Sequence, residues 1–170
     1  MRRLRLIAST VLGCTALLAS SGVVRATEVG VQRLLGTGLV AGSSPGLTVK
    51  IWTRPTNAFD LGVGFGLGNF ACSERFNPCG TRNSVHADYL WQSGHVAHDH
   101  LSVHAGLGAR IWFWNYGTGT SDFQVAARAP VGLDLYIFRS FEGYLEIAPS
   151  LAVRPSALFL EGALGARLYL

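Results

Sequence analysis

Apolar residues alternate with small or polar residues along most of the chain, which is the period of a β-strand. In the run AFDLGVGFGLG, residues 58–68, every second residue is Phe, Leu or Val, and the residues between them are Ala, Asp and four glycines. A strand places these two classes on opposite faces, whereas a helix would scatter them around its axis. The same pattern recurs and predicts eight strands, at residues 31–41, 47–54, 58–68, 84–92, 101–114, 128–138, 144–151 and 157–170.

The segments between these strands favour turns, such as Ser-Ser-Pro-Gly at 43–46 and Pro-Thr-Asn at 55–57. Successive strands with short turns and no helix between them predict an all-β, antiparallel, up-and-down barrel. The two longest connections are expected to be the segment 69–83 and the loop 115–127, which fall on the same side of the barrel. Long loops on one side and short turns on the other are typical of outer-membrane barrels.

The interior of the predicted barrel is expected to be polar. In the strand 101–114 the odd-numbered positions are all apolar, whereas the even-numbered ones include His104 and Arg110. If the apolar faces point into lipid, the charged residues of the strands point inward, where ions of opposite sign must pair. The predicted inward polar network contains Lys50, Asp60, His86, Asp88, His104, Arg110, Arg128, Asp134, Glu146, Glu161 and Arg167.

Eight strands leave room for side chains in the interior but not for a wide channel. The inward glycines 62, 64, 66 and 68 would make space for bulky neighbours, for which Trp112, Trp114 and Arg110 are the candidates. Aromatic residues near predicted strand ends are candidates for the girdles that flank the lipid-facing band. They are Trp52, Trp91, Trp112, Trp114, Tyr116, Phe138 and Tyr144.

The N-terminus has the pattern of a secretory signal peptide, with Arg2, Arg3 and Arg5, an apolar stretch, and a small-residue cleavage site ending at Ala26. This divides the chain into a signal peptide, 1–26, and one barrel domain, 27–170. Four of the 14 Lys and Arg residues precede position 27 and none of the 10 Asp and Glu residues does. The mature chain therefore has no net charge with neutral His, which argues against nucleic-acid binding through bulk positive charge.

The cysteines allow two predictions about processing. Cys72 and Cys79 lie in a segment rich in Gly, Pro and Asn, and an exported chain is expected to join them as a disulfide. Two free thiols are the alternative. Cys14 follows Val-Leu-Gly, which loosely resembles a lipidation site, although the apolar stretch would then be only eight residues long.

Two groups of residues could carry chemistry. His95, His98 and His100 could gather a divalent metal such as zinc, or could simply belong to a solvated turn. Ser102 and His104 could serve an envelope lipid deacylase, with His86 and Asp88 on a neighbouring strand. Residues two apart on a strand lie about 7 Å apart, however, which is too far for a reliable nucleophile-to-base hydrogen bond. The expectation is therefore a barrel without catalysis and without a cofactor.

The runs GLTVKIWTRPTNAFDLGVGF, HADYLW, AGLGARIWF, VGLDLYIF, YLEIAPSL and the end GALGARLYL resemble a family of small bacterial outer-membrane β-barrels, related in architecture to the OmpA transmembrane domain and OmpX. The resemblance covers nearly all of the mature chain. It implies an eight-stranded transmembrane barrel in the bacterial outer membrane, surrounded by outer-membrane lipids and inserted by the assembly machinery. Gly165, Leu168 and Leu170 match that machinery's C-terminal pattern in part, because its last residue is usually Phe.

The sequence therefore predicts a structural or surface-interaction role in the cell envelope, with no wide pore and with an unidentified surface partner. Two alternatives stay open. One is the lipid-modifying enzyme described above. The other is a soluble, lipocalin-like barrel, whose apolar face would line an internal lipid cavity.

Overall fold

The computed structural model describes residues 29–66, 81–93, 100–115, 121–138, 140–153 and 156–170. The predicted signal peptide, Cys14, the predicted disulfide of Cys72 with Cys79, and the histidines 95 and 98 lie outside these residues. The described part of the chain contains no helix long and apolar enough to cross a membrane.

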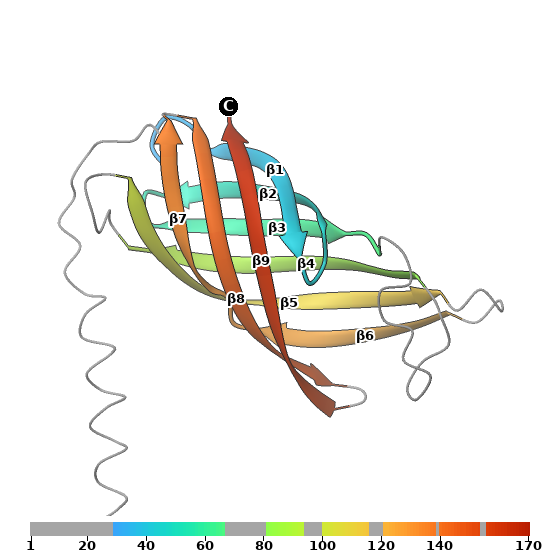
Figure 1. Ribbon diagram of the computed structural model, residues 1–170. Helices are drawn as coiled ribbons and strands as arrows, with labels where there is room; N and C mark the ends of the chain where they lie inside the picture. Colours follow the sequence, from blue (N-terminus) through green and yellow to red (C-terminus); the bar gives the residue numbers. More distant parts are fainter. Residues whose placement is uncertain (1–28, 67–80, 94–99, 116–120, 139, 154–155) are drawn as a thin grey trace, which may run out of the picture.

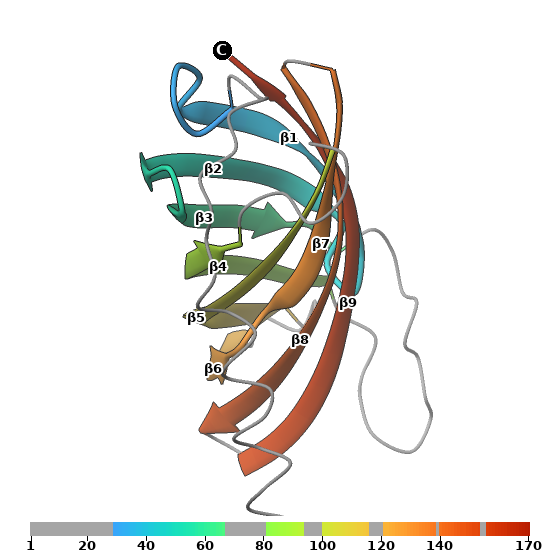
Figure 2. The same cartoon turned by 90° about the vertical axis from the view of Figure 1, so that its left-hand side faces the viewer.

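The described residues form nine antiparallel strands that close into a ring (Figures 1 and 2). Neighbours in sequence pair from β1 to β5, and β9 pairs with both β8 and β1, so that the last strand closes on the first. The strands are β1 (Leu35–Gly42), β2 (Gly46–Arg54), β3 (Asn57–Gly64), β4 (Thr81–Gln92), β5 (Leu101–Asn115), β6 (Ser121–Arg128), β7 (Val131–Phe138), β8 (Phe141–Val153) and β9 (Ser156–Tyr169). The prediction of an all-β antiparallel barrel is confirmed.

The strand count differs from the predicted eight because β6 and β7 are successive segments at a single position of the ring. Each of them pairs with β5 on one side and with β8 on the other. Pro130, which has no backbone N–H, interrupts them. Its carbonyl nevertheless accepts a hydrogen bond from the Gly106 N–H at 2.8 Å, and the Ala129 N–H donates to the Pro149 carbonyl at 3.0 Å. Nine strand segments therefore fill eight positions around the barrel.

The predicted loop 115–127 was wrong from residue 121 onward, where β6 begins. Phe123 and Val125 point outward, and Gln124 and Ala126 are buried. This alternation is visible in the sequence, but it is short and it is followed by Pro130.

The first strand begins at Leu35, four residues later than predicted, because residues 29–34 fold back as a turn. Gly30 has φ = +81°, a conformation that glycine adopts without strain. The turn inserts Val29 among Trp52, Tyr136 and Tyr169 at the end of the barrel where the described chain begins and ends.

The two faces of the barrel differ sharply in polarity. Outward apolar residues are largely exposed, for example Leu107 at 60% and Leu164 at 61% of their surface. Inward charged residues are buried, for example Asp60 with 2% and Arg110 with 5% of the surface exposed. A water-soluble barrel has the opposite distribution.

Inward glycines accommodate rings from the neighbouring strand. His86 is the cross-strand partner of Gly62, and a Cβ at Gly62 would lie 2.2 Å from the His86 ring. Tyr144 covers Gly165 in the same way. The neighbours expected for the 62–68 glycines, Trp112, Trp114 and Arg110, were therefore the wrong ones at Gly62, because the pairing of β3 with β4 brings His86 there.

Candidate functional site

Among the described residues, ten charged side chains are buried in the interior of the barrel, and every strand except β1 contributes at least one. They come from alternate positions on the strands, so the inward face of each strand supplies them. The buried acids are Asp60, Asp88, Asp134, Glu142, Glu146 and Glu161, and the buried bases are Lys50, Arg110, Arg128 and Arg167. We call this set, together with His104, the interior network.

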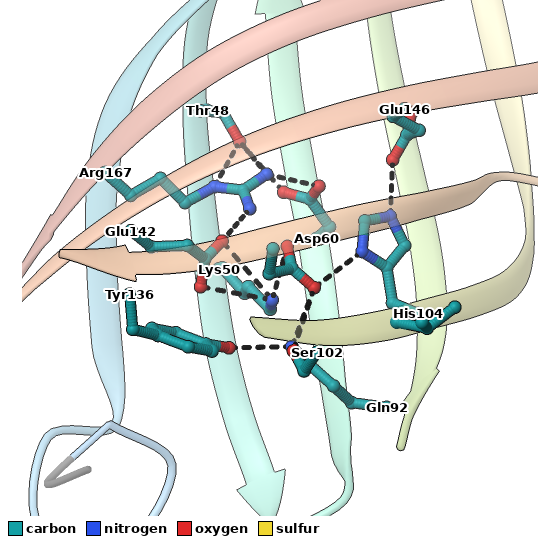
Figure 3. A network of polar contacts seen from close by, with 12 residues as sticks. Thr48, Lys50, Asp60, Gln92, Ser102, His104, Tyr136, Glu142, Glu146 and Arg167 are labelled. Atoms are coloured by element: carbon teal, nitrogen blue, oxygen red, sulfur yellow. Dashed lines mark hydrogen bonds and ion pairs between the residues drawn. The ribbon is translucent and has the colours of Figure 1, made fainter. Parts of the chain in front are cut away.

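Arg167 lies at the centre of one half of the interior network (Figure 3). Its guanidinium donates to Asp60 at 2.6 Å, to Glu142 at 2.7 Å, and to the Thr48 hydroxyl at 2.9 and 3.2 Å. The guanidinium also stacks over the Tyr144 ring, with its carbon 3.9 Å from the ring centroid. A planar fork of donors suits two carboxylates at once, which a lysine could not do in the same geometry.

Glu142 joins three donors at the chain-terminus end of the barrel. In addition to Arg167, it accepts from the Tyr169 hydroxyl at 2.5 Å and from the Lys50 ammonium at 3.3 and 3.4 Å. Lys50 also lies 3.7 Å from Asp134. These contacts connect β2, β7, β8 and β9 across the interior.

His104 links the two halves of the interior network, because its Nδ1 lies 2.7 Å from Asp134 and its Nε2 lies 3.3 Å from Glu146 (Figure 3). Ser102 accepts a hydrogen bond from Gln92 at 2.6 Å and lies 3.5 Å from Asp134. Both His104 nitrogens thus face carboxylates, and the nearby serine is oriented by an amide. Among these contacts no hydrogen bond joins Ser102 to His104, so the deacylase alternative lacks its nucleophile-to-base pair.

The other half of the interior network lies toward the opposite end of the barrel, which we call the loop end, and it is built around two arginines. Arg128 donates to Glu146 at 2.5 Å and lies 3.3 Å from Asp88. Arg110 forms an ion pair with Glu161 and donates to His86 Nδ1 at 3.0 Å. His86 and Asp88 are therefore held by arginines and do not contact the serine.

The interior of the barrel contains a small cavity among the described residues. A cavity of about 20 Å³ lies in the loop-end half, which is room for about one water molecule. Its lining includes Ser44, Asp60, His86, Arg110, Arg128 and Glu161.

Ten of the eleven predicted network residues are buried, and His86 is half-buried. Sequence reasoning missed Glu142, because this residue lies between the predicted strands 128–138 and 144–151, in a segment expected to turn. Glu142 nevertheless shares parity with Tyr144 and Glu146. Sequence reasoning also missed the neutral partners Thr48 and Gln92, which have no charge to reveal them. With Glu142 included, the buried network has six acids and four bases besides His104.

The described residues contain no group of three His, Cys, Asp or Glu side chains arranged to hold a metal ion. His100, one of the three histidines considered for a metal site, faces the Tyr136 backbone carbonyl at 2.8 Å through its Nδ1.

Comparisons with known proteins agree with this architecture at the level of the fold. No protein-family model matches the chain, and no curated protein matches it. Among solved structures, the N-terminal β-barrel domain of OprF from Pseudomonas aeruginosa is similar, with a TM-score of 0.61 and 12% sequence identity, over 81% of this chain and 98% of that domain.

Proposed function

We propose that the mature chain is an outer-membrane β-barrel that spans the bilayer, with a closed polar interior and a structural or surface-interaction role. The observation that carries this proposal is the inverted distribution of polarity, with ion pairs inside and apolar side chains outside. In hydrocarbon an apolar outer wall costs nothing, and a closed ring satisfies every backbone group within the band. The OmpA-like fold supports the same location.

Aromatic residues at two levels of the outer wall support a membrane band. At the chain-terminus end, Phe59, Tyr89 and Trp91 stack edge to face, with ring centroids 5.1 and 5.3 Å apart. At the loop end, the exposed Phe113 and Phe123 are cross-strand partners. Trp91 pairs with Ala105 on β5, eight residues before Phe113, so the two levels lie about 27 Å apart along the strand and about 21 Å along a barrel axis at a 40° tilt. Lipid-facing bands of such barrels are about 25 Å tall.

The interior favours a barrier over a pore. The interior network crosses the barrel from β2 and β3 to β8 and β9, and the nearby cavity holds about one water molecule. A wide, permanently open channel would need an interior free of such crossings. We therefore expect no large, steady conductance.

The location is tested by fractionation and heat modifiability of the protein expressed with its full sequence. Recovery with the outer membrane, and a folded band on cold electrophoresis that shifts after boiling, are expected. Recovery in the periplasm without detergent would contradict the proposal and favour a soluble barrel. Processing before Thr27 is checked by N-terminal sequencing of the same material, because the signal peptide is part of the proposal.

The partners that this proposal names are outer-membrane lipids and the outer-membrane assembly machinery. A deacylase role has less support, because His104 is committed to Asp134 and Glu146. A lipocalin-like role has less support as well, because most of the large aliphatic residues of the strands lie on the outer surface and ten charged residues are buried.

A further inference from the structure

A β-bulge lies at the end of β2, at the chain-terminus end of the barrel. Trp52 pairs with Ala58 on β3, and the next pair is Arg54 with Asn57. Thr53 is therefore an extra residue on β2. Without the bulge, Arg54 would share the inward face of Trp52, which is buried. With the bulge, Arg54 lies opposite Asn57 in the outward set of β3, and its side chain is exposed.

Arg54 shares a cross-strand row with the aromatic residues at this end of the outer wall. Asn57 pairs with Trp91 on β4, and the next outward pair is Phe59 with Tyr89. These three rings form the aromatic level at the edge of the proposed lipid-facing band. Asn57 is two residues nearer the turn than Phe59, so Arg54 lies about 7 Å beyond the Phe59 level along the strand. In a membrane, this is the level of the lipid headgroups.

Hydrogen-bond donors lie beside this arginine. The Thr56 hydroxyl donates to Asn57 Oδ1 at 2.9 Å, and the Thr53 hydroxyl donates to the Asn57 backbone carbonyl at 3.2 Å. The first of these bonds occupies the amide oxygen of Asn57, so the amide NH2 group is the part that Asn57 offers to a ligand. The Arg54 guanidinium adds a planar fork of N–H donors. Phosphate oxygens accept hydrogen bonds from such a set of donors.

No acidic side chain of the described residues pairs with Arg54. Six of the seven acids in this part of the chain are buried in the interior network. The seventh, Asp122, is exposed near the start of β6, at the loop end. An exposed guanidinium without a carboxylate partner is available to an anion from outside the chain. The charge at this place on the wall therefore selects a negatively charged ligand.

We propose that Arg54 and Asn57 bind the phosphate of an anionic phospholipid in the periplasmic leaflet, with the rings of Phe59, Tyr89 and Trp91 against its glycerol and upper acyl region. The inference rests on the proposed outer-membrane location and names the lipid class held at one place on the wall. The longest connection between the described strands, from β3 to β4, is at the loop end, which places the chain-terminus end in the periplasm.

A headgroup with a net negative charge should bind this site better than a zwitterionic one. The Arg54 guanidinium attracts the phosphate of either lipid. No acidic side chain of the described residues lies there to attract the choline group of a zwitterionic lipid. We expect a preference of about fivefold for the anionic lipid, which is the size that one arginine at a membrane surface contributes.

Trp91 can report which lipid occupies the site. The chain has four tryptophans, of which Trp52 and Trp112 are buried in the interior. Trp114 lies on the inward face and is half-buried, whereas Trp91 is on the outer wall with 48% of its surface exposed. Bromine atoms on a lipid chain quench the fluorescence of a tryptophan that they touch. Quenching by a brominated lipid therefore measures the share of that lipid beside Trp91.

The test uses the protein expressed with its full sequence, purified and reconstituted into phosphatidylcholine vesicles. A small fraction of the lipid is replaced either by brominated phosphatidylglycerol or by brominated phosphatidylcholine, at equal mole fraction. For the wild type, the quenching should give a relative binding constant of about five in favour of phosphatidylglycerol. The preference should become smaller in high salt, because the headgroup region is open to screening ions.

Three variants separate this site from a general effect of charge. Arg54→Gln should lower the relative binding constant to about one, because the cation is lost. Asn57→Asp should do the same, since it places a carboxylate beside Arg54 and keeps an acceptor for the Thr56 hydroxyl. Arg82→Gln is the matched control, because it removes the same charge from an exposed arginine at the loop end of β4. It should keep the wild-type preference.

The possible results separate the lipid site from the membrane location. Equal quenching of the wild type by the two brominated lipids would overturn the site and leave the location intact. A preference that survives Arg54→Gln, or that is lost to the same extent in Arg82→Gln, would also overturn it. If neither lipid quenches the fluorescence, Trp91 does not face hydrocarbon and the proposed location fails. Heat modifiability, measured for every variant, ensures that folded barrels are compared.

Discussion

Replacement of Arg167 by methionine should be among the most destabilising single changes in this barrel. Arg167 is almost completely buried, with 1% of its surface exposed, and it binds Asp60, Glu142 and Thr48. Methionine keeps much of the side-chain volume but removes the charge. Asp60 then has no ion-pair partner, and Glu142 keeps Lys50 as its one cationic partner among the described residues. Breaking a buried ion pair by removing one partner costs about 3–5 kcal/mol. We expect a loss of this size in the free energy of unfolding.

The measurement is equilibrium unfolding by urea of protein refolded in detergent micelles or lipid vesicles, followed by tryptophan fluorescence. Arg54→Met is the control, because Arg54 is exposed at the β2–β3 turn, where changes usually stay within about 0.5 kcal/mol. In the double variant with Asp60→Asn, part of the loss should be recovered, since the orphaned carboxylate is then neutral. A loss below about 1 kcal/mol for Arg167→Met would refute the reasoning, because it would mean that water or lipid headgroups replace the arginine without cost.

Three further changes test other parts of the same reasoning. Asp88→Asn should leave the free energy of unfolding in urea unchanged or raise it slightly, because Asp88 lies opposite the like-charged Asp60 across β3 and β4, and Arg128 still has Glu146 as its partner. Asp60→Asn should lower the free energy of unfolding, and equal losses for the two variants would contradict this reasoning. Leu107→Arg, on the outer wall midway along β5, should lower the free energy of unfolding by about 2–4 kcal/mol in vesicles. The loss should be smaller in a short-chain detergent, where the arginine can reach water, and an equal loss there would argue against a lipid-facing position. Gly165→Val should lower the urea midpoint of unfolding, because the added Cβ would lie 2.3 Å from the Tyr144 ring and displace it. Gly162→Val is the control and should leave the midpoint unchanged, because a Cβ there meets no atom within 4 Å.

Much of the fold could be predicted from the sequence, because residues of alternating polarity indicate the two faces of each strand. The outward set of β5 and the charged inward set of β9 are where parity places them. The errors arose where the local signal was interrupted. The short strand β6 was missed because Pro130 follows it closely and breaks the pattern. Glu142 was missed because the predicted strand began at residue 144, whereas β8 begins at Phe141.

The partners within the interior network could not be predicted in the same way. Arg167 and Asp60 are 107 residues apart, and they meet only because β9 closes on β1 in one particular register. Likewise, the expectation of Trp112 or Trp114 beside the 62–68 glycines failed at Gly62 because the pairing of β3 with β4 brings His86 there. Parity gives the face of a residue, but register gives its neighbour, and register depends on the whole ring.

The interior network itself helps to specify that register. A slip of one residue between β1 and β9 would turn Arg167 outward and Leu168 inward, so polarity alone excludes it. A slip of two residues would keep every side chain on its proper face, and polarity would not exclude it. Such a slip would shift Arg167 by about 7 Å, away from Asp60 and Thr48 on the other side of the closing seam. The cost of leaving these groups unpaired in the interior thus selects one closed ring among those that the apolar pattern permits.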